Sequence, residues 1–249
     1  MTAAIDQPIV QLELRVRDLA RACAFYAEAF GWRVTVTHPG AYALADTGRL
    51  PLIGLMQTAD DGVPIGAVPY ARTPDAGASA ALVRELGGSV LADRTDAGSG
   101  FWAHTLDPWG NELAFWEPRS LTDPALAGDG RHPITWIELR APRLADAVAY
   151  YRRLCGWHFQ VSPGAEDFAF AAERGQVGVG LVGGPRAELL TALTPYVRVA
   201  DLDETARRVH ALGGQLSATR ARATAGGTFR IFTDPSGNTL GLFAEPGAR

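Results

Sequence analysis

Apolar and polar residues alternate at the start of this chain and then change to a helical spacing. From Gln11 to Val16 every second residue is apolar, which is the period of a half-buried strand. A single helical stripe follows, made of Leu19, Ala22, Cys23, Tyr26, Ala29 and Phe30. Asp18 is the expected N-cap of this helix, and Gly31 is its expected end.

The same pattern occurs again further along the chain. Ile9–Trp32, IVQLELRVRDLARACAFYAEAFGW, aligns without a gap with Ile134–Trp157, ITWIELRAPRLADAVAYYRRLCGW. A second strand–helix pair, Val68–Gly88, matches Thr194–Gly214 in the same way. Self-similarity at this spacing indicates an internal repeat. We therefore predict four copies of one strand–helix module.

Short apolar stretches after each helix predict three further strands per module. In the first half these are Arg33–Thr37, Ala41–Ala45, Pro51–Gln57, Ser89–Arg94, Phe101–Leu106 and Asn111–Trp116. The chain is thus expected to hold four βαβββ modules, two in residues 7–118 and two in residues 132–246. Residues 119–131 are rich in Pro, Gly and Asp and are expected to be a linker.

One helix covers only one face of the sheet in its module. We expect two modules side by side to close the other face into a cup, with helices outside and a ligand cavity inside. The phrase Asp-Pro-X-Gly-Asn occurs twice, at Asp107 and at Asp234. Pro presets φ, while Gly and Asn tolerate positive φ, so each copy is expected to be a structural turn joining two strands.

Composition is that of an ordinary globular protein and excludes some partners. The 249 residues are 47% hydrophobic and 20% charged, and all 23 basic residues are Arg, which is typical of a GC-rich coding bias. A net charge of -4 gives no support to nucleic-acid binding. No apolar run reaches membrane length and no leader peptide is evident, so we expect a cytoplasmic protein. Cys23 and Cys155 fall in helices and are expected to be free thiols.

The repeated start LRVRDLARACAFYAEAFGW and the closing phrases DPWGNELAFW and DPSGNTLGLF resemble the vicinal oxygen chelate superfamily. This superfamily includes glyoxalases, extradiol dioxygenases and the bleomycin- and fosfomycin-resistance proteins. The resemblance covers nearly the whole chain apart from the linker, and is greatest to two-domain members described as hydroxylases. It implies an α+β fold of two tandem domains, each with a cupped mixed sheet.

The resemblance also places a metal in the cup, held by His, Glu or Gln from the first and last strand of each module. The corresponding positions here are Gln11, Gly54, Val68 and Ala114 in the first domain, and Trp136, Gly180, Thr194 and Gly241 in the second. A transition-metal site needs at least three N, O or S donors. We therefore predict no catalytic metal and no cofactor.

Strand parity directs other side chains into the predicted cups. The candidate ligand-binding residues are Gln11, Glu13, Arg15, Tyr70, Arg72, Trp102, His104, Trp116, Trp136, Glu138, Tyr196, Arg198 and Phe243. The Glu and Arg residues have two interpretations: they neutralise each other across the cup floor, or they contact a polar group of a ligand. The aromatic residues either fill the cup as core or line it for a large, flat ligand.

Two function hypotheses follow. In the first, the protein binds a bulky aromatic natural product or antibiotic without metal, for sequestration, resistance or carriage. In the second, it is a metal-free tailoring enzyme of secondary metabolism, a cyclase, isomerase or hydroxylase component, with Glu13 or Glu138 as general base. A third interpretation, that only one cup is functional, is compatible with either. The chain is expected to be a monomer or a homodimer.

Overall fold

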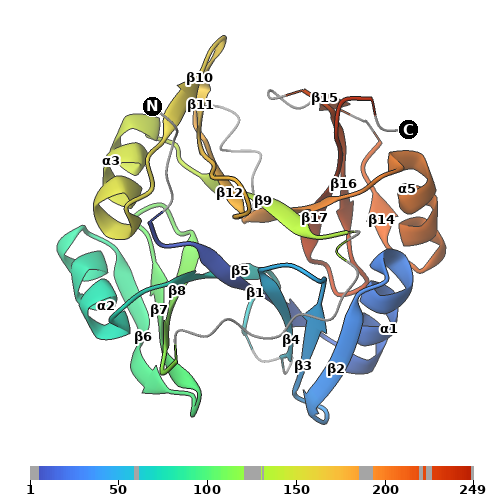
Figure 1. Cartoon of the computed structure of the whole chain (residues 1–249), viewed down its shortest axis with the longest axis horizontal. Coiled ribbons are helices and arrows are strands. Elements are labelled where there is room, and N and C mark those ends of the chain that lie inside the picture. The colour runs from blue at the N-terminus through green and yellow to red at the C-terminus, as the bar shows by residue number, and fades with distance from the viewer. Residues whose placement is uncertain are drawn as a thin grey trace. The chain divides into compact units, whose positions relative to one another are not determined.

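The computed structural model describes residues 6–58, 62–120, 130, 132–184, 193–218, 221–222 and 226–247. Its elements follow the predicted order of four βαβββ modules (Figure 1). Module 1 comprises β1 (Ile9–Val16), α1 (Leu19–Phe30), β2 (Arg33–His38), β3 (Tyr42–Asp46) and β4 (Leu52–Gln57). Module 2 comprises β5 (Ala67–Arg72), α2 (Ala76–Glu85), β6 (Ser89–Asp96), β7 (Gly100–Leu106) and β8 (Glu112–Pro118).

The second half repeats this order. Module 3 comprises β9 (Ile134–Arg140), α3 (Leu144–Cys155), β10 (Gln160–Ser162), β11 (Ala165–Ala171) and β12 (Gly178–Val182). Module 4 comprises β13 (Thr194–Arg198), α5 (Leu202–Ala211), β14 (Gln215–Leu216), β15 (Ala221–Arg222), β16 (Thr228–Thr233) and β17 (Thr239–Ala244). The predicted linker falls mostly on residues 121–129 and 131, which lie outside the described residues.

The strands form two mixed sheets, as expected for the α+β fold class. Their orders are β2-β3-β4-β1-β5-β8-β7-β6 and β10-β11-β12-β9-β13-β17-β16-β14, with β15 paired to β16. Within a module, the first strand and the last strand run parallel, as β1 and β4 do, whereas the hairpin strands run antiparallel. A parallel neighbour needs a crossover connection, which the helix of each module supplies.

Local signals at the ends of the helices agree with the sequence. Asp18 accepts a hydrogen bond from the backbone of Arg21 at the start of α1. Gly31 and Gly156 end α1 and α3 with φ of 70° and 65°, a left-handed conformation that favours glycine. Both cysteines are free thiols; Cys155 is buried and Cys23 is half-buried.

The chain packs into two compact units that differ from its sequential halves. The first compact unit contains Met1–Val10, Val68–Ala125 and Ile137–Leu193, and so joins modules 2 and 3. The second contains Gln11–Ala67, Leu126–Trp136 and Thr194–Arg249, and so joins modules 1 and 4. Each unit is described by itself below. The domain boundaries drawn from the sequence stay a prediction.

In the first compact unit, the Asp-Pro-Trp-Gly-Asn turn docks onto module 3. The hydroxyl of Tyr151, on α3, donates to the buried carboxylate of Asp107 at 2.6 Å. Asn111 binds the end of β9 twice, donating to the Arg140 carbonyl at 2.7 Å and accepting from its N–H at 3.0 Å. The turn therefore has a tertiary role besides joining two strands.

The second compact unit repeats this arrangement with the other turn. Tyr26, on α1, donates to Asp234 at 2.8 Å, and Asn238 donates to the Arg15 carbonyl at 2.9 Å. Burial, followed by the Asp234 charge, raises the pKa of Tyr26 well above its usual value. A hydroxyl that stays protonated remains a donor to the carboxylate.

Trp32 and Trp157 belong to the core beside these contacts. They are 3% and 0% exposed. Trp32 stacks on Tyr26 with ring centroids 5.1 Å apart, and Trp157 stacks on Tyr151 at 5.4 Å. Their indole N–H groups donate to backbone carbonyls, so their polar atoms are satisfied as buried groups require. Among the described residues, no helix is both long and apolar enough to cross a bilayer.

Candidate functional site

An aromatic surface lies on one face of the module 2 sheet. Registry places Arg72, Trp116 and Trp102 in one row across β5, β8 and β7, and Tyr70, Ala114 and His104 in the next row. Residues in register point to the same side of a sheet. We call Tyr70, Arg72, Trp102, His104 and Trp116 the aromatic face.

The opposite face of this sheet is core. Ala71, Ala103 and Phe115 are fully buried, and α2 packs against β6, β7 and β8. All five side chains of the aromatic face are half-buried instead. Strand parity therefore places Trp116 opposite Phe115, as the sequence predicted. Whether these residues bind a ligand stays a prediction.

Neighbouring residues orient the side chains of the aromatic face. A Cβ atom on Gly100 would overlap the Trp116 ring, so glycine at this position allows the indole to lie along β7. The rings of Trp102 and His104 meet edge to face, with centroids 6.4 Å apart. His104 Nε2 lies 2.8 Å from Glu112 Oε2, which makes an ion pair when the imidazole is protonated.

Module 4 carries the equivalent surface in a more closed form. Tyr196 pairs with Gly241 across β13 and β17, and a Cβ at Gly241 would overlap the Tyr196 ring. Tyr196 is only 6% exposed. In module 2 the partner of Tyr70 is Ala114, whose Cβ excludes that ring position. Tyr70 is half-buried, and this tyrosine is therefore more accessible than its counterpart Tyr196.

Other predicted residues of module 4 lie beside Tyr196. Phe229 meets Tyr196 edge to face at 5.8 Å. Phe243, the counterpart of Trp116, is half-buried. A Cβ added to Gly227 would lie 3.0 Å from the Phe243 ring. Arg198 pairs with Glu245 at 3.1 Å. Both groups of this ion pair are partly exposed, so it contributes little to stability.

Module 3 contributes Trp136, Glu138 and Arg140 to the predicted second cup, and all three are half-buried. The backbone of Arg140 binds Asn111. Its guanidinium Nε is buried and has no hydrogen-bond partner in the described part of the chain. Trp136 and Glu138 both take part in interactions.

In module 1, Tyr42 contacts the predicted polar residues Gln11 and Glu13, and this tyrosine was not predicted from the sequence. Gln11 donates from Nε2 to the Tyr42 hydroxyl at 2.9 Å. Burial, followed by the charge of Glu13, raises the pKa of Tyr42, while its hydrogen bond with Gln11 lowers it and that with Glu13 raises it. Glu13 is 7% exposed. Parity along β3 was the available signal, because Tyr42 alternates with the buried Ala43 and Ala45.

Arg15, the last predicted residue of β1, is also buried. It is 6% exposed and donates from Nη1 to the Pro64 carbonyl at 3.3 Å. Arg72, its counterpart in module 2, is half-buried and in register with Trp116 on the aromatic face. Both arginines take part in further interactions. Mutual neutralisation of Glu and Arg in the cups stays a prediction.

In the first domain, the residues at the metal-ligand positions that the resemblance implies do not fit a metal. A Cβ at Gly54 would overlap the Tyr42 hydroxyl and lie 3.3 Å from Gln11 Nε2, so Tyr42 occupies the space of a ligand side chain there. Val68 and Ala114 carry no donor atom in their side chains. In the described ranges, no three His, Cys, Asp or Glu residues come together as metal ligands.

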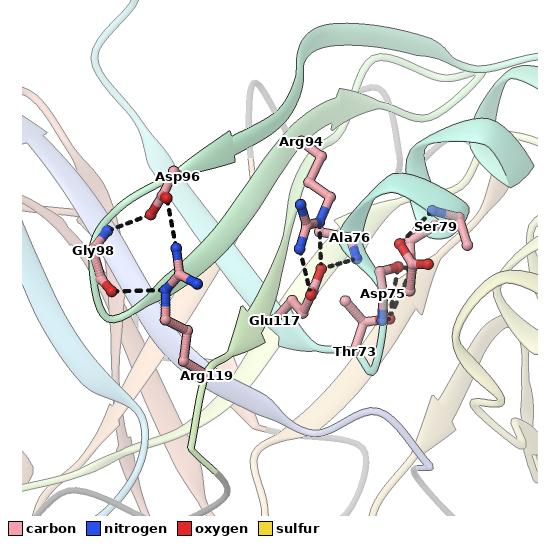
Figure 2. Close-up of polar contacts among 10 residues, drawn as sticks. Thr73, Asp75, Ala76, Ser79, Arg94, Asp96, Gly98, Glu117 and Arg119 are labelled. Carbon is pink, nitrogen blue, oxygen red and sulfur yellow. Dashed lines mark hydrogen bonds and ion pairs between the residues drawn. The ribbon is translucent and has the colours of Figure 1, made fainter.

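A polar cluster at the far edge of module 2 was also not anticipated. Arg94 binds Glu117 through two hydrogen bonds of 2.7 and 2.8 Å, and Glu117 also accepts from the Ala76 backbone at the start of α2 (Figure 2). Arg119 pairs with Asp96 at 2.5 Å. The Arg94 hydrogen bond, the largest cause, lowers the pKa of Glu117 to about 2.

Phe101 lies between the two arginines of this cluster. The guanidinium carbons of Arg94 and Arg119 lie 3.3 and 4.3 Å from its ring centroid, as in cation–π contacts. Phe101 is therefore part of a structural cluster and has the opposite parity to Trp102. This cluster supports the edge of the sheet that carries the aromatic face.

The fold and these positions define a class of protein. The first half, residues 8–115, matches the sequence model of the Glyoxalase/Bleomycin resistance protein/Dioxygenase superfamily. Residues 136–243 match that of the Glyoxalase-like domain. The chain belongs to this superfamily and carries two of its domains in tandem.

Curated relatives cover most of the chain. It is 26% identical over 239 residues to "Putative glyoxylase CFP32" of Mycobacterium tuberculosis (strain CDC 1551 / Oshkosh), with 91% of this chain and 90% of that protein covered. It is also 26% identical over 232 residues to "Anthracycline biosynthesis protein DauV" of Streptomyces sp. (strain C5), with 80% and 79% covered.

Solved structures share the fold. The Mn(II)-bound glyoxalase from Novosphingobium aromaticivorans matches with a TM-score of 0.68 and 19% identity, covering 98% of this chain and 83% of that one. The 2,3-dioxygenase LapB from Pseudomonas sp. KL28 matches with a TM-score of 0.67 and 13% identity, covering 100% and 95%. At these identities the likeness concerns the fold alone.

Proposed function

We propose that the protein binds a bulky aromatic natural product on the aromatic face, without a metal, for sequestration, resistance or carriage. The observation that carries this proposal is the pair of half-buried tryptophans, Trp102 and Trp116, in register beside Tyr70 and His104. Aromatic walls with few polar groups suit a large, flat ligand. A relative named for anthracycline biosynthesis supports a polycyclic aromatic ligand.

The proposed site has no metal because the residues at the expected ligand positions of the first domain supply too few donor atoms. Tyr42 takes the space above Gly54, and Val68 and Ala114 have no donor atoms. Ala114 lies in register between Tyr70 and His104 and offers no donor atom, where the family's enzymes would carry a ligand side chain. The same position thus favours an organic ligand over a coordinated ion.

The second candidate is a metal-free tailoring enzyme with Glu13 as general base. The burial of Glu13 and the biosynthetic name of the relative favour it. Against it, Glu13 accepts a hydrogen bond from Tyr42, and hydrogen bonding to the charged form of a carboxylate makes it a weaker base. Binding is therefore the better supported of the two functions.

The test is a titration of the full chain with the fluorescent anthracycline doxorubicin. Trp102→Ala and Trp116→Ala should each weaken binding about tenfold, because each removes an aromatic contact. Val161→Ala, which shortens an exposed apolar side chain on β10 outside the aromatic face, is the control and should bind normally. Equal affinity of all four proteins would contradict the proposal.

Recovery of the ligand separates binding from catalysis. After incubation, the compound released by denaturation is compared with the starting material by mass and chromatographic retention. Unchanged mass and retention support sequestration or carriage. A changed mass or an isomer of changed retention supports the enzyme and makes Glu13→Gln the next variant.

A further inference from the structure

A separate pocket lies in the first compact unit, between the Asp107 turn and the helix of module 3. It holds about 530 Å³ and is open to solvent, a size typical of small-molecule sites. Its lining includes Trp109, Tyr150, Arg143, Asp146 and Arg153. None of these residues belongs to the aromatic face.

The pocket has an aromatic wall. Trp109 and Tyr150 meet edge to face, with ring centroids 5.6 Å apart. Tyr150 is 6% exposed. The indole Nε1 of Trp109 is buried and has no acceptor among the residues that the structure describes. An unpaired buried donor is costly, so an acceptor supplied by a ligand would relieve that cost.

The charged residues of the pocket are two cations and one anion. Arg143 pairs with Asp146 at 3.2 Å, and Arg153 pairs with Glu85, outside the lining, at 3.5 Å. All four side chains of these pairs are more than half exposed. Exposed ion pairs are weak, so a ligand anion can compete for either guanidinium.

The repeat provides an internal comparison, because the second compact unit has the same elements with reversed charges. The positions of Arg143, Asp146 and Arg153 correspond to Asp18, Arg21 and Glu28. Those of Trp109 and Tyr150 correspond to Ser236 and Phe25. The fold of the repeated module can therefore form without Trp109 and Tyr150 at these positions and without the two arginines.

In the second copy, the positions equivalent to Arg143 and Trp109 make local hydrogen bonds. Asp18 caps α1 by accepting from Arg21, and the Ser236 hydroxyl accepts from the Arg17 backbone at 3.2 Å. Arg143 makes no such capping contact on α3. The same loop position therefore caps the helix with its side chain in one copy and provides no side-chain cap in the other.

We propose that this pocket is a second binding site, for a small aromatic anion of the aryl carboxylate class. The aromatic ring of the ligand packs against Trp109 and Tyr150, and its carboxylate binds Arg143 and Arg153. Guanidinium groups suit carboxylates because their donors match the two oxygens. This site is independent of the function proposed for the aromatic face.

The test uses the full chain labelled with 5-fluorotryptophan and titrated with 2-naphthoate, followed by fluorine NMR. The Trp109 resonance is assigned by its absence from the Trp109→Ser spectrum. That variant copies the serine of the second turn, so its fold is compatible with the repeat. We expect the Trp109 resonance to shift and saturate, and Trp102 and Trp116 to report separately on the aromatic face.

Two comparisons test the role of charge. The neutral analogue 2-naphthalenemethanol and the Arg143→Asp variant should each weaken binding at Trp109 by about tenfold or more. Arg207→Asp, which makes the same charge change on an exposed position of α5, should leave the affinity unchanged. An unshifted Trp109 resonance, or equal binding of the neutral analogue and of Arg143→Asp, would overturn the proposal. Neither result depends on anthracycline binding.

Discussion

The hydroxyl of Tyr26 lies 2.8 Å from the carboxylate of Asp234, although 208 residues separate them in sequence. Tyr151 and Asp107 make the same contact at 2.6 Å across 44 residues. Each pair joins the first helix of one sequential half to the closing turn of the other. The Asp-Pro-X-Gly-Asn phrase occurs in both halves of the chain. In each half it forms a turn, and its aspartate also makes a tertiary contact.

Removing the hydroxyl from Tyr151 should destabilise the fold. Tyr151→Phe leaves the buried Asp107 with one donor fewer, at an expected cost of about 1–3 kcal/mol in the free energy of unfolding. Urea denaturation measures this change. Tyr150→Phe, on the same helix, is the control, because its hydroxyl makes no hydrogen bond to any described residue. Equal costs for both variants would contradict a specific role of the Tyr151 contact.

A side chain at Gly54 should be destabilising because Tyr42 already occupies its space. Gly54→Ala is expected to cost about 1–3 kcal/mol through overpacking. The double variant with Tyr42→Phe should recover part of this cost, since the hydroxyl is the atom that overlaps. Gly66→Ala is the matched control, because nothing lies within 4 Å of its added Cβ. If the double variant shows no recovery in denaturation experiments, Tyr42 does not fill this space.

The ion pair of Arg94 and Glu117 predicts a pH dependence of stability. The pKa of Glu117 is lowered in the folded protein from 4.5 to about 2. Ionised Glu117 therefore stabilises the fold above pH 4.5, and this contribution is lost as the pH falls towards 2. The stability difference between the protein and Glu117→Gln should shrink over this window. Glu28→Gln, at an exposed position of α1, is the control, and the same pH trend in both variants would refute the assignment.

Arg143→Asp should stabilise the protein. Helices α1, α2 and α5 each begin at an aspartate that accepts a backbone hydrogen bond, whereas Arg143 gives α3 no side-chain cap. An aspartate cap is expected to add about 0.5–1 kcal/mol. Thermal unfolding of this variant beside Arg207→Asp measures the gain. A loss of stability would show that Arg143 has a structural role in the native loop.

Trp116→Ala and Trp136→Ala should differ in their effect on aromatic ligands. Tyr70 is half-buried and Tyr196 is 6% exposed, so we predict that binding takes place on the module 2 side. Trp116→Ala should then weaken doxorubicin binding by about tenfold, while Trp136→Ala leaves it within twofold. The reverse result would assign the ligand to the second half of the chain.

Strand parity and local turn chemistry allowed most of the fold to be predicted. The alternation at Gln11–Val16 predicted β1, and Asp18 and Gly31 predicted the ends of α1. The aromatic face was also predictable, since Trp116 and Phe115 must point to opposite sides of β8. Tyr42 was missed because parity along β3 gives the side of the sheet on which it lies, but not that its ring extends over a glycine of the neighbouring strand β4.

Sequence by itself determined the four βαβββ modules, their order and the side of each strand on which a residue lies. These properties depend on periodicity and on residues close together along the chain. Only the tertiary structure decided that module 2 packs with module 3 and module 1 with module 4, and that each turn aspartate is met by a distant tyrosine. Such contacts join segments with no local signal for one another, because burial and hydrogen bonding act through space and not along the chain.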